Sequence, residues 1–204
     1  FKFRAKITGI RFSPSFLPEY FSPASSAGKK TVANLCYLCK IKQIHSFLKM
    51  ENKKNELIML GTGNAAVTRC YNTCFALRTS QGTLLVDAGG GNGILIQLEK
   101  AGIAISDIHN LFVTHAHTDH ILGVIWIIRT IAQHMQQGKY EGIFRVYAHD
   151  KAIQVIDWIC RMTLPGKIVA CLGERILLCE VKDGDALEAA GMKLQCFDIL
   201  STKE

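Results

Sequence analysis

The most informative stretch of this sequence is Thr114-His115-Ala116-His117-Thr118-Asp119-His120, where four side chains able to bind a metal ion fall within six residues. Side chains alternate along an extended segment, so His115 and His117 point to the same side and can hold one ion. Asp119 and His120 stand where the next helix begins and face a neighbouring point. Neutral imidazole and carboxylate groups suit zinc or a similar divalent ion. The sequence therefore predicts a metal site here.

The flanking patterns place this stretch between a strand and a buried helix. Leu111–Thr114 is an apolar strand pattern, and residues 120–135 carry apolar side chains at helical spacing. Further strands are predicted at Glu56–Leu60, Thr73–Thr79, Thr83–Asp87, Arg145–Ala148, Ile176–Val181 and Met192–Ile199, and further helices at Ile94–Ala101 and Lys151–Met162. We expect the last two strands to be joined through Asp183-Gly184-Asp185. Strands that alternate with helices indicate an α/β protein.

Positive charge is concentrated in the first quarter of the chain. Residues 1–49 hold nine Lys and Arg against one acid, while the other 155 residues hold 15 basic and 16 acidic side chains. Met50 begins a segment typical of a protein start, directly before the first well-patterned strand. We expect residues 1–49 to be a basic segment of upstream translation or a disordered arm, and residues 50–204 to be the domain. A nucleic-acid-binding arm and a targeting peptide are the alternatives.

The motif His115-Ala116-His117-Thr118-Asp119-His120 resembles the HxHxDH motif of the metallo-β-lactamase-fold hydrolases. Upstream, three stretches resemble the ribonuclease Z-like branch of that superfamily: Leu60-Gly61-Thr62-Gly63, Tyr71-Asn72-Thr73 and Leu85-Val86-Asp87-Ala88-Gly89. The resemblance implies a four-layer αββα sandwich and two metal ions, with Zn²⁺ expected and Mn²⁺ or Fe²⁺ as alternatives.

The resemblance also implies a role for individual residues. His115 and His117 would bind the first metal, and Asp119 and His120 the second. Asp119 would in addition orient the attacking water as the catalytic residue. Asp87 would lie behind the metal ligands and support the motif loop, although a strand-end carboxylate that caps the glycine-rich turn is an equal alternative.

The chain departs from the family pattern near its end. The family has a third His, a bridging Asp and a last His after the motif. Leu200 stands where the third His is expected, and a leucine side chain cannot bind a metal. The sequence stops at Glu204, before the other two ligands could follow. We therefore expect only the front half of the sandwich.

The expected function is a metal-dependent hydrolase that uses a metal-bridging hydroxide, namely a ribonuclease Z-like phosphodiesterase or transfer-RNA-processing nuclease. Hydrolysis of an ester, lactone, thioester or small phosphodiester by the same fold is the first alternative, and a catalytically dead, truncated copy is the second. The substrate would accordingly be RNA or a small phosphodiester or ester. Residues 50–204 carry a net charge of −1, which weakens the case for RNA.

The setting expected for this protein is the cytoplasm. Eight cysteines at irregular spacing favour a reducing compartment over a disulfide framework. The longest apolar candidate, Ile121–Ile128, is far shorter than the roughly 20 residues of a membrane helix, so no membrane partner is expected. A homodimer is an expectation from the resemblance alone.

Overall fold

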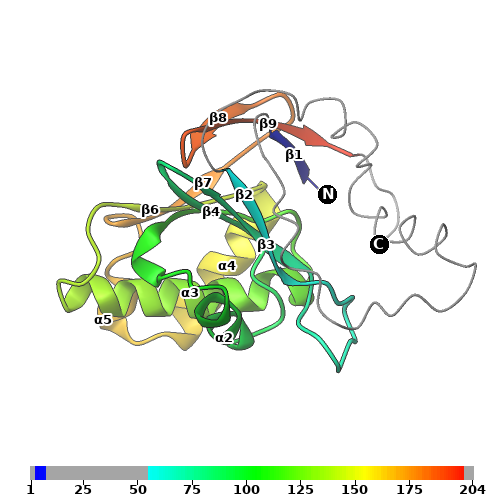
Figure 1. The fold of residues 1–204 in the computed structure, drawn as a ribbon. Coiled ribbons are helices and arrows are strands. Elements are labelled where there is room, and N and C mark those ends of the chain that lie inside the picture. Colours follow the sequence, from blue (N-terminus) through cyan, green and yellow to red (C-terminus); the bar gives the residue numbers. More distant parts are fainter. Residues whose placement is uncertain (1–2, 8–54, 200–204) are drawn as a thin grey trace, which may run out of the picture.

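Two β-sheets and one layer of helices form the part of the chain that the computed structural model describes, residues 3–7 and 55–199 (Figure 1). The larger sheet has the order β2 (Glu56–Gly61), β3 (Cys74–Thr79), β4 (Gly82–Val86), β5 (Ile108–Phe112), β6 (Phe144–Ala148) and β7 (Ile176–Glu180). The smaller sheet has the order β1 (Phe3–Ile7), β9 (Met192–Asp198) and β8 (Ala186–Ala189). The helices are α2 (Gly93–Lys100), α3 (Thr118–Gln136), α4 (Asp150–Thr163) and α5 (Gly166–Val169), with a short 3-10 helix η2 (Ile105–Asp107).

The direction of the strands changes within the larger sheet. Strands β2, β3 and β4 pair antiparallel, whereas β4, β5, β6 and β7 pair parallel. Helices α2, α3 and α4 lie in the connections between successive parallel strands. Because parallel strands end at the same edge of a sheet, the segments that follow β4, β5, β6 and β7 all emerge along one edge.

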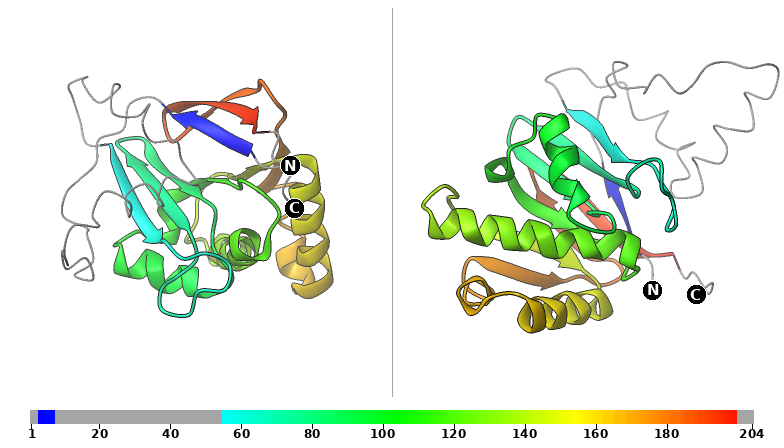
Figure 2. Two further views of the ribbon diagram at one scale, coloured as in Figure 1. Left: turned by 90° about the vertical axis from the view of Figure 1, so that its right-hand side faces the viewer. Right: turned by 90° about the horizontal axis from the view of Figure 1, so that it is seen from below.

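Alternating side chains of the larger sheet supply two separate apolar layers. Leu85 and Leu111 pack in the cluster formed with the helices, whereas their neighbours Leu84 and Phe112 pack against the smaller sheet. Figure 2 shows the helices on one side of the larger sheet and β1, β8 and β9 on the other. The order of layers is therefore helix, sheet, sheet, which corresponds to three layers of the expected αββα sandwich.

The prediction of an α/β protein is confirmed, and one predicted connection is wrong. The strand predicted at Ile176–Val181 does not lead into that at Met192–Ile199, because β8 lies between them and β7 belongs to the other sheet. The turn before β8 is closed by hydrogen bonds to Cys196, whose N–H donates to the Asp185 carbonyl oxygen over 2.7 Å. Strand β8 has only four residues, Ala186–Ala189, and too little apolar pattern to be noticed.

Some expectations fall on residues outside the described ranges. Leu200 is one of them, and so is most of the segment 1–49. Within that segment Phe3–Ile7 forms β1, which pairs antiparallel with β9. No helix in the described ranges is long and apolar enough to cross a membrane.

Helix α3 lies unusually close to the segment that follows β4. The Gly123 N–H donates to the Gly89 carbonyl oxygen over 2.8 Å, and the Ala88 N–H donates to the His120 carbonyl oxygen over 3.1 Å. A Cβ atom at Gly123 would collide with the Ala88 carbonyl oxygen, which is backbone and cannot swing aside. Glycine at position 123 therefore sets the distance between the start of α3 and the end of β4.

Replacing Gly123 with alanine is expected to destabilise the fold by about 1–3 kcal/mol, because the helix must move away from the Ala88–Gly89 backbone. Gly166→Ala is the matched control, since a Cβ at Gly166 meets no atom within 4 Å; this variant should stay within about 0.5 kcal/mol of the wild type. Urea unfolding followed by circular dichroism measures both variants. Equal stabilities of the two would contradict the close approach.

Candidate metal centre

The predicted metal-binding residues lie at the edge of the larger sheet where the parallel strands end. Asp87 directly follows β4, and the motif from Thr114 to His120 connects β5 to α3. The backbone holds the two segments side by side, because the Asp87 N–H donates to the Phe112 carbonyl oxygen over 2.8 Å. The parallel pairing of β4 with β5 thus brings together residues that are about 30 positions apart in sequence.

The structure gathers the three motif histidines into one cluster. The ring centroids of His115 and His117 are 4.6 Å apart, and those of His115 and His120 are 4.0 Å apart. His115 and His120 are buried, with 6% and 5% of their surface exposed, whereas His117 is exposed. Asp119 lies beside them, with its Oδ2 atom 3.4 Å from His120 Nε2. One end of the cluster is therefore enclosed and the other is open to solvent.

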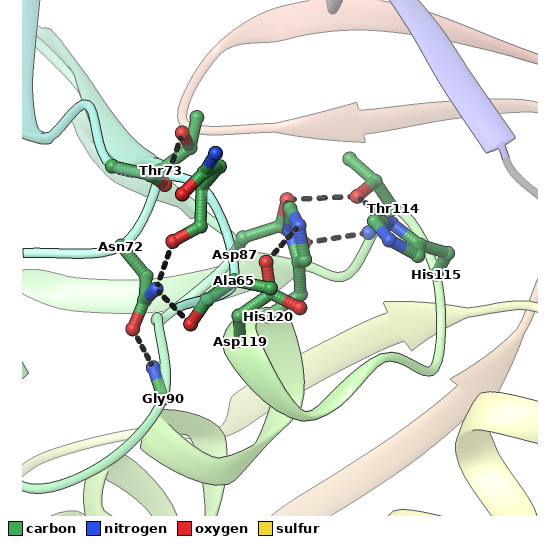
Figure 3. Close-up of polar contacts among 11 residues, drawn as sticks. Ala65, Asn72, Thr73, Asp87, Gly90, Thr114, His115, Asp119 and His120 are labelled. Atoms are coloured by element: carbon green, nitrogen blue, oxygen red, sulfur yellow. Dashed lines mark hydrogen bonds and ion pairs between the residues drawn. The ribbon is translucent and has the colours of Figure 1, made fainter. Parts of the chain in front are cut away.

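The Asp87 carboxylate lies behind the cluster and contacts both ends of the motif (Figure 3). Its Oδ1 accepts a hydrogen bond from the Thr114 N–H at 2.8 Å, and its Oδ2 accepts one from the Thr114 hydroxyl at 2.7 Å. The same Oδ2 lies 2.8 Å from His120 Nδ1. The Thr114 hydroxyl oxygen in turn lies 2.9 Å from His115 Nδ1. Asp87 thus supports the motif loop, and no capping bond from it to the glycine-rich turn is found in the described residues.

The backbone at Asp87 is itself unusual. Its φ of +55° lies in the left-handed region that most non-glycine residues avoid. Aspartate and asparagine tolerate this conformation better than other side chains. The conformation turns the chain sharply after β4, so that the carboxylate points back at Thr114 while the glycine run moves on to α2. The local strain is offset by the hydrogen bonds that the carboxylate accepts.

Tyr71 and Asn72 fasten the glycine-rich turn to the loop before β3. The Tyr71 hydroxyl lies 2.6 Å from the Gly91 carbonyl oxygen and 2.9 Å from that of Ala88. Its ring fills the space over Gly89 and Gly93, where added side chains would collide with it. Burial raises the pKa of Tyr71 to about 12, so its hydroxyl keeps its proton at neutral pH. The glycines therefore make room for a tyrosine next to the predicted metal-binding motif.

Asn72 makes the second link between these segments. Its side-chain oxygen accepts from the Gly90 N–H at 3.2 Å, and its side-chain nitrogen donates to the carbonyl oxygens of Asn64 and Ala65 (Figure 3). A Cβ at Gly90 would lie 3.8 Å from the Asp119 Cα. The exposed loop of residues 64–70 is in this way held beside the start of α3.

The donor atoms fit a divalent metal ion in kind, and one pair fits it in spacing. Two ligands bound to one zinc at about 2.0–2.2 Å in tetrahedral geometry lie roughly 3.3–3.6 Å apart, and Asp119 Oδ2 and His120 Nε2 are 3.4 Å apart. Nevertheless, no group of three or more His, Cys, Asp or Glu side chains is placed to hold an ion anywhere in the described residues. A complete site therefore needs some of these side chains to shift, or a donor from elsewhere.

The sequence patterns did not assign roles to Thr114, Tyr71 or Asn72. Thr114 ends the strand pattern, and nothing in a strand pattern distinguishes a hydroxyl that contacts a carboxylate 27 residues away. Tyr71 and Asn72 were only part of a stretch that resembles a family. The one signal that could have indicated Thr114 is a polar side chain directly before a dense group of potential metal ligands.

Comparisons with known proteins match the part of the chain that contains this site. The sequence profile of the family described as "Anti-Pycsar protein Apyc1" matches residues 55–197. The ribonuclease Z of Pyrococcus abyssi is 33% identical over 102 residues, which cover 50% of this chain and 31% of the relative. The ribonuclease Z of Thermobifida fusca is 42% identical over 80 residues, which cover 38% of this chain and 24% of the relative. The chain thus spans about a quarter to a third of the curated relatives that it matches.

Among solved structures, a metallo-β-lactamase fold protein of Bacillus subtilis is similar with a TM-score of 0.49 and 17% identity, over 65% of this chain and 49% of that protein. The resemblance to ribonuclease Z-like sequences is confirmed by the relatives. Because its profile covers more than two thirds of the sequence, the chain belongs to the family of the anti-Pycsar protein Apyc1.

Asp87→Asn is expected to lower the free energy of unfolding of the metal-free protein by about 2–3 kcal/mol. The amide keeps the size of the side chain and tolerates the φ of +55°, but its NH₂ group cannot accept from the donors around it. Asp107→Asn, at an exposed position, is the control and should change the stability by less than about 0.5 kcal/mol. Chemical unfolding of the wild type and the two variants measures these free energies. An unchanged free energy of unfolding in Asp87→Asn would show that the contacts of the carboxylate do not stabilise the fold.

Proposed function

We propose that this member of the Apyc1 family contributes the HxHxDH half of a metal-dependent hydrolase that cleaves phosphodiester bonds. The observation that supports it is the cluster of His115, His117 and His120 held from behind by Asp87 at the edge where parallel strands end. The identity to proteins named ribonuclease Z, which covers only part of each chain, favours a phosphodiester as substrate.

Four side chains would hold two metal ions, the first bound by His115 and His117 and the second by Asp119 and His120. We expect zinc first, with manganese or iron(II) as alternatives. A divalent ion bound there would lower the pKa of a coordinated water and offset negative charge that develops on a substrate oxygen. His115 and His120, which are buried, would be the fixed ligands. His117 is exposed and would close the site from its open end.

Asp119 would have two tasks in this proposal. Its side chain is 14% exposed and faces His120 Nε2, so one oxygen serves as a ligand. The other oxygen can accept a hydrogen bond from the attacking water and orient it toward the substrate. A carboxylate at this place also takes the proton that the water releases.

RNA is the first substrate class to test, and a small phosphodiester is the second. A nuclease needs basic or aromatic groups that contact the strand beyond the reacting bond. The residues from 50 onward carry a net charge of −1, which favours the small substrate. An ester, lactone or thioester would need only the metal and the oriented water, and it forms the comparison class.

A second candidate function has one specific observation in its favour. Since no three-donor group is placed to hold an ion in the described residues, the chain could be a catalytically dead member that only binds a ligand or a partner.

Two further properties remain predictions from the sequence: a cytoplasmic location, in keeping with the free thiols of the six cysteines that lie in the described ranges, and assembly into a homodimer.

Metal content and hydrolysis test the proposal together. The purified 204-residue protein is expected to retain zinc through dialysis and to hydrolyse bis(p-nitrophenyl) phosphate faster than p-nitrophenyl acetate. His117→Ala removes the exposed ligand and should lower both the bound zinc and the phosphodiesterase rate at least tenfold.

His134→Ala is the matched control, because His134 lies near the far end of α3 and away from the motif. It should leave zinc content and rate unchanged. Zinc that is bound without any hydrolysis would favour the dead member. Loss of zinc from both variants, or from neither, would contradict the assignment of the ligands. A single-stranded RNA and a cyclic mononucleotide, offered side by side, then separate the two phosphodiester classes.

A further inference from the structure

In the hydrogen bonds behind the histidine cluster, the ionised carboxylate of Asp87 determines which group donates and which accepts. Asp87 accepts at both carboxylate oxygens, from the Thr114 N–H, the Thr114 hydroxyl and His120 Nδ1. An ionised carboxylate has no hydrogen to give. The nitrogen of His120 that faces it must therefore carry the proton. In the neutral imidazole the other nitrogen of His120, Nε2, is then unprotonated, and it lies 3.4 Å from Asp119 Oδ2.

The same count applies to Thr114. A hydroxyl has one hydrogen and can accept at its oxygen. The Thr114 hydroxyl gives its hydrogen to Asp87 Oδ2 over 2.7 Å, so only its lone pairs remain for His115 Nδ1 at 2.9 Å. A contact of this length needs a hydrogen between the atoms, and His115 has to supply it. A neutral His115 is thereby restricted to the tautomer with Nδ1 protonated and Nε2 unprotonated.

We propose that Thr114 is a positioning residue that relays the Asp87 carboxylate to His115. One carboxylate then sets the tautomer of both buried imidazoles, His120 directly and His115 through the threonine hydroxyl. The hydrogen bond at one ring nitrogen decides which nitrogen is available at the other side. The value of this arrangement for metal binding rests on the proposed function, whereas the tautomer is a property of the metal-free chain.

Two substitutions at position 114 distinguish the effect of the threonine hydroxyl from the effect of its shape. Thr114→Val keeps the branched shape but removes the hydroxyl, so His115 loses the acceptor for its Nδ1 hydrogen. Thr114→Ser keeps the hydroxyl and loses only a methyl group. Both variants retain the backbone N–H that donates to Asp87 Oδ1. In both, His120 keeps its direct contact with Asp87 and serves as an internal control.

Long-range ¹H–¹⁵N correlation spectra of the ¹⁵N-labelled, metal-free 204-residue protein at alkaline pH report which nitrogen of each imidazole is protonated. Signals are assigned with His115→Gln and His120→Gln. In the wild type and Thr114→Ser, His115 and His120 should both show a protonated Nδ1 and an unprotonated Nε2. In Thr114→Val, His115 should change to an Nε2-protonated or mixed pattern while His120 stays as it was.

An Nε2-protonated His115 in the wild type would overturn the relay, and so would identical His115 patterns in Thr114→Val and Thr114→Ser. If Thr114→Val does not fold, the wild-type pattern alone decides. Zinc affinity, measured by competition with a chelating dye, should fall about 10–100-fold in Thr114→Val and stay within a few-fold in Thr114→Ser. The expected tautomer change in a protein that binds no zinc would support the relay and contradict the proposed function, so the two fail separately.

Discussion

The rest of this site depends on one buried carboxylate, that of Asp87. A charge that is removed from water is costly unless hydrogen bonds replace the lost solvent. Here the replacement comes from Thr114, two residues after the end of β5, and from His120 in the first turn of α3. Satisfying the carboxylate therefore holds the segment after β5 and the first turn of α3 at fixed positions relative to the end of β4. The proposed metal ligands lie in the segment between those two points.

Close backbone packing also helps to position the motif. Gly123 lets α3 touch the segment after β4, and the glycines around position 90 leave room for the ring of Tyr71. The glycine run therefore serves to bring backbone and aromatic ring close together. Side chains at these positions would push α3, Tyr71 or the motif loop outward. The position of the histidines thus depends on backbone and aromatic packing as well as on their own hydrogen bonds.

The sequence could predict the elements and the motif because both are local. Periodic apolar residues predict α3, and four metal-binding side chains within six residues predict a metal site. The contacts of Asp87 could not be predicted from spacing, since they depend on the parallel pairing of β4 and β5 and join residues 27 and 33 positions apart. The short strand β8 could not be predicted although it is local, because its four residues are too few to show a periodic apolar pattern.

The site therefore has an anchored part and an adaptable part. His115 and His120 are buried and held at one nitrogen each, so little ordering remains for them when a ligand binds. His117 is exposed, and its ring centroid lies 4.6 Å from that of His115, with which it would share the first ion. A metal that binds only the arranged form stabilises that form by mass action. In the proposed site, preorganisation by Asp87 and Thr114 would lower the cost of arranging His115 and His120, so the affinity would depend chiefly on His117 and Asp119 at the open end.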